Sequence, residues 1–338
     1  GTDLLRIQTF AGPLSQTEGA TDLGNVPPTE AVSYLMGVAT RAEGRPARDA
    51  ITPAMLAQGA SVTRELLALA RNTDRPAEVR RSALSWLVRR RGEPGGMSPE
   101  EVSRTLATIA QDEAEARTVR DQALHSLARM ESAAALEALV AMSARSPDAW
   151  LARRATEVMA SSGDPRAREH LRAAAERSDL AEAARIAAIR GIGGSFATGR
   201  DAEFLRGLYA RVNSDRLRDA IMQAVASIGG RSNREWIMAI ARNDNESIAT
   251  RRRAITLAER LGMSAADLAS LYDQIETTDV RAQIISQLGT NGTRAAADKL
   301  IAIARDEPMI SLRRRAIQAL GRFDDPRVKE VLRELVGR

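Results

Sequence analysis

Small and apolar residues recur three and four positions apart in a short segment that repeats along the chain. Residues 312–320 read LRRRAIQAL and are followed by Gly321, and residues 280–288 read VRAQIISQL and are followed by Gly289. This spacing places the apolar residues on one side of a helix. The central residue of each such helix, which we call the anchor, is Ala83, Ala123, Ala155, Ala188, Ala224, Ala254, Ile284 or Ala316.

Successive anchors are 40, 32, 33, 36, 30, 30 and 32 residues apart. A period in this range indicates a helical solenoid, in which each repeat buries its apolar side against its neighbours. We call the anchored helices B helices. The A helices that precede or follow them are expected near residues 61–71, 133–144, 165–175, 201–212, 233–241, 265–275, 293–304 and 326–336, with a further one starting at Pro99. Residues 91–98, RGEPGGMS, account for the 40-residue spacing.

Helix boundaries are marked by aspartate, proline and glycine. Asp164-Pro165 and Asp325-Pro326 each open an A helix, because aspartate caps a helix and proline at its first position loses no hydrogen bond. Glycine after a B helix predicts a left-handed terminator. The glycines in question are Gly193, Gly229, Gly262, Gly289 and Gly321.

The start of the chain lacks this pattern. Residues 1–28 have no helical period and contain several glycines and prolines, which predicts an extended arm with one short strand near residues 5–10, or else a disordered tail. Residues 29–60 predict an irregular helical cap, with helices to about residue 41 and over 52–57. The repeat array is then expected over residues 61–338.

The period, the Asp-Pro helix starts and the pattern VRxxAIxxLG resemble HEAT repeats, in particular the short repeats of phycobilin-lyase-like proteins, over residues 60–338. The resemblance implies an all-α fold, a right-handed α-α superhelix of about eight to nine units. It also implies that B helices line the concave surface. Such a fold is shared by proteins of many functions.

The third position before the anchor, position −3, is arginine in six of the eight B helices: Arg80, Arg120, Arg185, Arg251, Arg281 and Arg313. Ala152 and Ile221 interrupt the series. An aspartate stands in the turn before most of these arginines: Asp74, Asp112, Asp179, Asp244, Asp279 and Asp306. Position −3 lies about 60° from the anchor, at the edge of the buried stripe, so an arginine there can reach a turn carboxylate of its own or of the adjacent repeat. HEAT proteins are known for Asp–Arg ladders, so we assign these arginines a structural role.

Positions −2, −1 and +2 point away from the core and are expected to face a ligand. Ile186, Ala187, Met222 and Ala226 predict a central apolar patch, or alternatively Ile186 and Met222 pack between repeats. An exposed apolar patch rimmed by polar groups is typical of an interaction site. The predicted partner-binding residues are Arg81, Arg153, Arg154, Ile186, Ala187, Arg190, Met222, Ala226, Arg252, Arg253, Arg314 and Arg315.

The amino-acid composition excludes several kinds of site. The chain of 338 residues has a formal net charge of +5, and nearly all of its basic residues are arginine, which reflects either function or genomic base composition. The absence of cysteine excludes disulfides, thiolate zinc sites and cysteine nucleophiles. No run approaches the roughly 20 apolar residues of a membrane span.

Candidate catalytic groups do not converge. His125 and His170, the only histidines, fall on different helices without a metal-binding motif. Residues 191–200, GIGGSFATGR, suggest a phosphate-binding loop but lack the following Lys-Ser/Thr, and Ser195 lacks the GxSxG context of a nucleophile. We therefore expect no enzyme activity, no metal and no cofactor.

The sequence favours a scaffold that docks a protein or peptide on its apolar patch and pairs flanking arginines with acidic groups. The alternative is nucleic-acid binding through an arginine-lined groove, although a net charge of +5 is modest for that role. The lyase resemblance implies a third possibility, an accessory role with tetrapyrroles. Because the sequence begins at Gly1, we leave open a cytoplasmic location or, after removal of a signal peptide, a periplasmic or secreted one.

Overall fold

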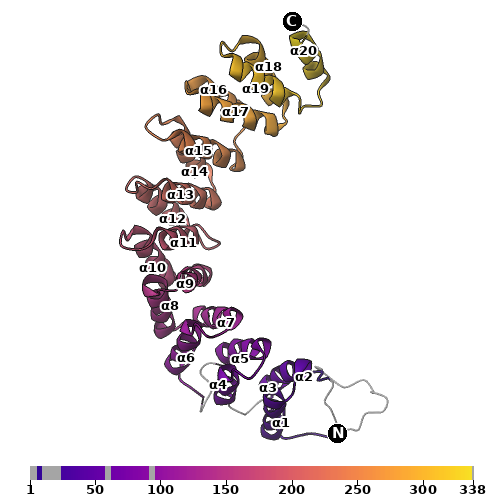
Figure 1. Cartoon of the computed structure of the whole chain (residues 1–338), viewed down its shortest axis with the longest axis vertical. Coiled ribbons are helices and arrows are strands. Elements are labelled where there is room, and N and C mark those ends of the chain that lie inside the picture. Colours follow the sequence, from indigo (N-terminus) through magenta and orange to yellow (C-terminus); the bar gives the residue numbers. More distant parts are fainter. Residues whose placement is uncertain (1–5, 10–23, 58–61, 91–95, 337–338) are drawn as a thin grey trace, which may run out of the picture. The chain divides into compact units, whose positions relative to one another are not determined.

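The computed structural model describes residues 6–9, 24–57, 62–90 and 96–336. Every regular element in these ranges is a helix, and the helices form an α-α solenoid (Figure 1), so the predicted fold class is confirmed. The contacts between residues divide the chain into two compact units, Gly1–Gly191 and Ile192–Arg338. Among the described residues, no helix is long and apolar enough to cross a membrane.

Three helices, the second and third of them short, open the first unit. They are α1 (Pro28–Arg41), α2 (Gly44–Asp49) and α3 (Ile51–Leu56), and they pack on one another. Sequence analysis missed α2, which buries Pro46 and Ala47. Residues 6–9 contain no strand, and the rest of the predicted arm, residues 1–5 and 10–23, lies outside the described residues. The division into arm, cap and array stays a prediction.

The first unit continues as alternating A and B helices. Its A helices are α4 (Thr63–Arg71), α6 (Pro99–Gln111), α8 (Ala133–Arg145) and α10 (Pro165–Glu176). Its B helices are α5 (Ala77–Arg89), α7 (Arg117–Ala128), α9 (Ala149–Ser161) and α11 (Glu182–Ile192). A helices pack on B helices, α5, α7 and α9 pack side by side, and so do α6, α8 and α10, which gives two layers.

The second unit has the same plan. Its A helices are α12 (Gly199–Tyr209), α14 (Arg231–Arg242), α16 (Ala265–Gln274), α18 (Arg294–Asp306) and α20 (Pro326–Val336). Its B helices are α13 (Asp215–Ile228), α15 (Ile248–Arg260), α17 (Thr278–Asn291) and α19 (Ile310–Leu320), and consecutive ones pack together. Helix α20 packs on α18 and α19 and is the last helix of the described residues.

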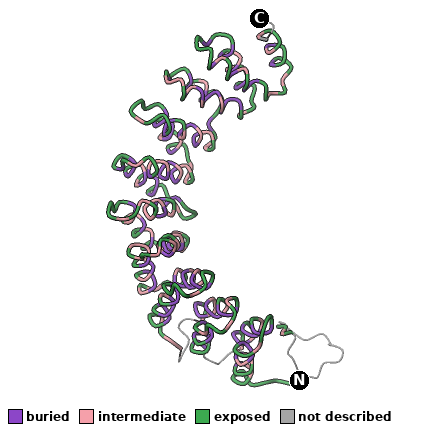
Figure 2. The backbone as a smooth tube through the Cα atoms, viewed as in Figure 1, coloured by how far each residue is buried: buried purple, intermediate pink, exposed green. Residues whose placement is uncertain are grey.

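The core lies between the two layers of each unit (Figure 2), where the apolar sides of A and B helices meet. The anchors and the residues that follow them are almost completely buried, as at Ala83 and Leu84 and at Ala123 and Leu124. The predicted caps are also present. A carboxylate oxygen of Asp164 accepts a hydrogen bond from Arg166 N at 2.8 Å, and one of Asp325 accepts from Arg327 N at 2.9 Å.

The glycine prediction is confirmed at two positions and wrong at three. Gly229 and Gly262 have the positive φ that glycine allows, 73° and 77°. Gly321 has a φ of −59°, and Gly193 and Gly289 do not have a positive φ. Gly193 and Gly289 instead allow close helix packing, because a Cβ there would lie 2.7 Å from Ala224 Cα and 2.9 Å from Ala319 Cβ respectively. Helix α17 continues past Gly289 and ends before the left-handed Gly292.

Candidate partner-binding surface

Five of the six arginines at position −3 turn back toward the ends of their own A helices. Arg80 Nε donates a hydrogen bond to Ala70 O at 2.9 Å, and Arg120 Nε donates to Ala110 O at the same distance. The guanidinium groups of Arg185, Arg251 and Arg281 donate in the same way. These bonds satisfy carbonyls at or near the carboxyl ends of the A helices, which lack partners within the helix and favour positive charge.

The same guanidinium groups also reach the next repeat. Arg80 pairs with Glu115, with Nη1 2.9 Å from Oε1, and Arg120 pairs with Asp148 at 2.6 Å. In the second unit, Arg281 pairs with Glu307 at 3.2 Å. Each of these arginines therefore ties its own A helix to the A–B turn of the following repeat, as the structural role assigned from the sequence requires.

We call the position −3 arginines and the carboxylates that pair with them the arginine ladder. Most of its carboxylates are not the aspartates predicted from the sequence. Among the described residues, Asp244 is the only one of the six predicted aspartates that pairs with a ladder arginine, Arg251, at 2.6 Å. Other turn aspartates bind within their own turn, as Asp112 accepts from Ala114 N at 3.0 Å. The arginine side chains instead point along the stack, so their partners come from one repeat further on.

Aromatic rings lie against two of the position −3 arginines. The guanidinium carbon of Arg120 lies 4.8 Å from the centre of the Trp150 ring, and that of Arg281 lies 4.3 Å from the Tyr272 ring, distances suited to cation–π attraction. The Tyr272 hydroxyl donates to Glu307 at 2.6 Å, and burial together with this bond raises the pKa of the phenol. Sequence analysis did not find these rings, because they stand at no fixed position in the repeat.

Helix α13 has a different register from the one predicted. Arg218 Nε donates to Val212 O at 3.1 Å, and Arg218 pairs with Glu246 at 3.0 Å, so Arg218 is the ladder arginine of this helix. The anchor of α13 is then Ile221 and not Ala224, and Ala188, Ile221 and Ala254 become evenly spaced by 33 residues. The error arose because both Ile221 and Ala224 lie on the apolar side of α13.

This register removes the predicted apolar patch. Met222 follows the true anchor and is 1% exposed, and Ala187 is 9% exposed, so the expectation that both face a ligand is wrong. Ile186 and Ala226 are half-buried. The alternative, packing between repeats, fits Met222, which lies in the core of its unit.

Two of the predicted binding arginines are committed to carboxylates on the preceding B helix. Arg154 pairs with Asp121 and with Glu157, and Arg253 pairs with Asp219, with Nε 2.7 Å from Oδ1. These bonds to Asp121 first, and then to Glu157, raise the pKa of Arg154, against the effect of burial. Sequence analysis did not identify Asp121 and Asp219 as partners of these arginines.

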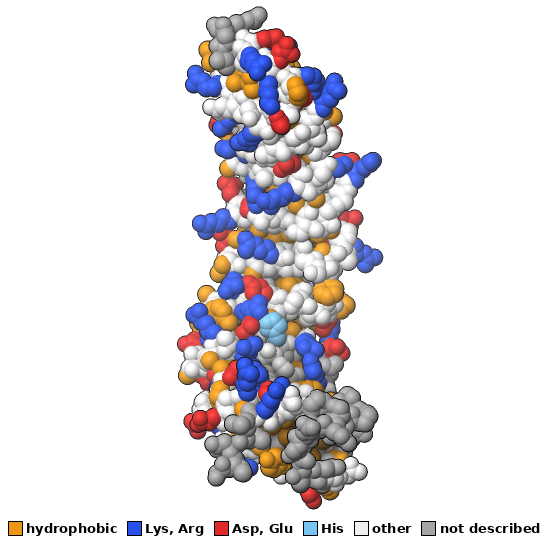
Figure 3. Space-filling model, turned by 90° about the vertical axis from the view of Figure 1, so that its right-hand side faces the viewer, with side chains coloured by type: hydrophobic (Ala, Val, Ile, Leu, Met, Phe, Trp, Pro, Cys, Tyr) orange, Lys and Arg blue, Asp and Glu red, His pale blue; other side chains and the backbone are white. Residues whose placement is uncertain are grey.

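The remaining predicted arginines are more available. Arg153 is exposed and pairs with Glu157, and Arg252 reaches Gln283 at 3.5 Å. Among the described residues, four more are exposed and have no carboxylate within ion-pair distance: Arg81, Arg190, Arg314 and Arg315. Figure 3 shows basic side chains gathered around a histidine in its lower half. Arg154 Nη2 lies 3.3 Å from His125 Nε2.

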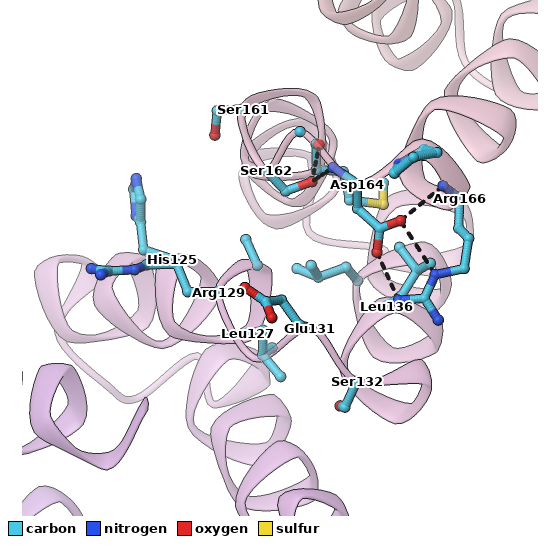
Figure 4. A pocket seen from close by; sticks show the side chains of 15 residues that line it. His125, Leu127, Arg129, Glu131, Ser132, Leu136, Ser161, Ser162, Asp164 and Arg166 are labelled. Carbon is cyan, nitrogen blue, oxygen red and sulfur yellow. Dashed lines mark hydrogen bonds and ion pairs between the residues drawn. The ribbon is translucent and has the colours of Figure 1, made fainter. Parts of the chain in front are cut away.

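A hollow of about 690 Å³ lies in the first unit, between the ends of α7 and α9 and the starts of α8 and α10 (Figure 4). Its floor is made of buried apolar side chains, including Leu127, Leu139 and Met159. The Asp164 carboxylate at its edge is bonded to Arg166, and these hydrogen bonds lower its pKa although burial opposes them. The described lining therefore offers no pair of free acid and base groups.

Other chemical sites have little support in the described residues. No group of three or more His, Asp or Glu residues there is placed to hold a metal ion. His125 is half-buried beside Asp121 and Arg154, and His170 is exposed on α10. At the start of α12, Asp201 accepts from Thr198 N at 2.8 Å, so a carboxylate already occupies the position that a phosphate would take in the suggested loop.

Two layers of short helices, tied from repeat to repeat by arginines, define an α-solenoid repeat protein. Residues 268–338 match the family model of HEAT repeats, which confirms the HEAT resemblance for that part of the chain. No curated protein matches the sequence.

Solved structures with the same fold share little sequence with this chain. Lipovitellin is 12% identical, with a TM-score of 0.52 over 93% of this chain and 34% of the lipovitellin chain. The Kap95p complex with RanGDP is 10% identical, with a TM-score of 0.50 over 92% of this chain and 47% of that one. The CpcE–CpcF phycocyanin lyase of Nostoc sp. PCC7120 is 16% identical, with a TM-score of 0.31 over 82% and 96%. The likenesses to lipovitellin and Kap95p show the fold alone.

Proposed function

We propose that the chain is a non-catalytic scaffold that binds an acidic protein or peptide on the surface formed by its B helices. The proposal rests on an excess of positive charge on that surface. With α13 in its observed register, positions −2, −1 and +2 of the eight anchored helices hold eight arginines and three carboxylates, an excess of five positive charges. The whole chain has a formal net charge of +5, so all other positions together are balanced.

This excess is open to solvent. Arg154 and Arg253 neutralise two of the three carboxylates, Asp121 and Asp219, and the third, Glu157, lies between Arg153 and Arg154. An acidic partner would gain charge-assisted hydrogen bonds from the remaining arginines, and four of them, Arg81, Arg190, Arg314 and Arg315, have no ion pair within the described residues that must first be broken. Kap95p, a solenoid of similar fold, binds the protein RanGDP, which supports a protein partner by analogy only.

The test is binding of a fluorescein-labelled oligoglutamate peptide, followed by anisotropy. We expect Arg81→Glu and Arg252→Glu to weaken binding several-fold each, because both reverse an exposed, unneutralised charge. The matched control is Arg64→Glu, the same charge reversal at an exposed position of the A helix α4. Equal effects of all three variants would show that only net charge matters and would contradict a binding face.

Nucleic acid is the second candidate, since the same arginines could contact phosphates. It predicts that single-stranded DNA competes with the peptide and that its affinity falls steeply with salt, by about one counterion for each phosphate contacted. A protein partner that also offers apolar contacts predicts a shallower dependence on salt. The tetrapyrrole role stays a prediction, and visible absorbance of the purified protein tests it.

A further inference from the structure

The B helices of each unit are joined by a second set of contacts, between position −2 of one helix and position −1 of the next. Asp121 on α7 pairs with Arg154 on α9, and Asp219 on α13 pairs with Arg253 on α15. The partners are 33 and 34 residues apart in the sequence. The same step of the repeat thus forms the same ion pair in both units.

Where position −2 is arginine, the next position −1 is not. Arg252 on α15 faces Gln283 on α17, which accepts from it at 3.5 Å. Arg81 on α5 precedes Gln122 on α7, and Arg153 on α9 precedes Ala187 on α11. The sequence therefore avoids placing two arginines opposite each other and places an arginine at −1 opposite an aspartate.

The last step, from α17 to α19, departs from this rule. Position −1 of α19 is Arg315, and position −2 of α17, 33 residues earlier, is Ala282. Arg315 is exposed, and the described residues provide no carboxylate within ion-pair distance of it. This step therefore has the arginine at position −1, but the aspartate that pairs with it at two other steps is replaced here by Ala282.

The two neighbouring arginines are also unpaired among the described residues. Arg314 occupies position −2 and Arg313 the ladder position −3, and no carboxylate there lies within ion-pair distance of either. Residues 313–315 are therefore three consecutive cations, of which Arg314 and Arg315 are exposed.

We infer that Arg314 and Arg315 form a receptor for a carboxylate of the partner, an Asp or Glu side chain that takes the place that Asp121 occupies between α7 and α9 and Asp219 occupies between α13 and α15. This inference rests on the proposed binding of an acidic partner and states where its carboxylate is held. Charge complementarity selects an acidic protein segment as the occupant. The fork of one guanidinium can bind both oxygens of such a carboxylate, as in the internal pairs.

The internal pairs also suggest the test, because Ala282→Asp restores the missing carboxylate. The variant should satisfy Arg315 within the protein and weaken binding of a labelled oligoglutamate peptide by about fivefold, the upper range for an exposed ion pair. Arg314→Gln/Arg315→Gln should weaken it by at least as much. The control is Ala302→Asp, which makes the same change in net charge at an exposed position of α18.

The outcomes separate this inference from the broader proposal. Circular dichroism first establishes that each variant is folded, and the double arginine variant gives a second test because Ala282 is buried, with 5% of its surface exposed. Equal weakening by Ala282→Asp and Ala302→Asp, or none by the double variant, overturns the receptor. If Arg81→Glu and Arg252→Glu still weaken binding in that case, the B-helix surface stands, and if the wild-type protein does not bind the peptide, both proposals are wrong.

Discussion

Replacing Arg120 by methionine tests how much the arginine ladder stabilises the solenoid. Arg120 is 4% exposed, donates to Ala110 O at 2.9 Å, pairs with Asp148 at 2.6 Å and lies over Trp150. Methionine keeps much of the apolar stem and its contact with the ring. It removes both hydrogen bonds and leaves the acceptors without their partner.

The expected cost is about 3 kcal/mol. Hydrogen bonds to a charged group contribute about 1.5–3 kcal/mol each, and breaking a buried ion pair costs about 3–5 kcal/mol. The lower end of the range for a buried ion pair applies, because the Asp148 side chain is 20% exposed and keeps two backbone donors, Trp150 N and Leu151 N. Water can therefore replace part of what is lost at Asp148, but less of it at Ala110 O, beside the buried Arg120 side chain.

The control is Arg153→Met on helix α9, since Arg153 is 51% exposed and pairs only with Glu157 one turn away. Such a pair contributes about 0.2–0.5 kcal/mol. Urea unfolding followed by circular dichroism measures both variants. Hydrogen exchange should show the loss of protection centred on α6, α7 and α9, because repeats interact only with their neighbours. If both variants lower the unfolding midpoint equally, the ladder does not stabilise the stack and this reasoning fails.

Three further predictions follow from packing and charge. Gly289→Ala should destabilise the protein by about 1 kcal/mol, because the added Cβ would lie 2.9 Å from Ala319 Cβ. Gly207→Ala should stabilise it by about 0.5–1 kcal/mol, because no atom lies within 4 Å of the added Cβ. Thermal melts should show shifts of opposite sign for the two variants, and shifts of equal sign contradict the prediction. Met222→Glu should lower stability by more than about 3 kcal/mol, because it buries a charge; an unchanged melting curve would show that Met222 is accessible after all. Burial raises the pKa of Asp148, but the hydrogen bonds of this carboxylate outweigh burial and lower its pKa overall. The stabilisation from Asp148 is therefore present above the ordinary pKa of 3.8 and is lost as the pH falls below that value. Asp148→Asn should lose less stability over that pH range, and identical acid unfolding of the variant and the wild-type protein would refute the prediction.

The sequence alone determined the class of fold and the position of nearly every helix. Apolar spacing, proline and capping residues act within one helix, so their effect is visible without a structure. Helices α6, α10 and α20 begin at the residues predicted, Pro99, Pro165 and Pro326. The structural role of the position −3 arginines followed from helix geometry, which places them at the edge of the apolar stripe, together with the resemblance to HEAT repeats, which implies such a ladder.

Only the tertiary structure decided which groups meet. The apolar side of α13 allows Ile221 or Ala224 as anchor, and the contacts of Arg218 with Val212 and Glu246 select Ile221. Gly289 resembles a terminator in sequence, yet its role depends on how closely α19 approaches α17. Ion pairs between repeats and distances between helices are set by the stacking of residues some thirty positions apart, and no local pattern records them.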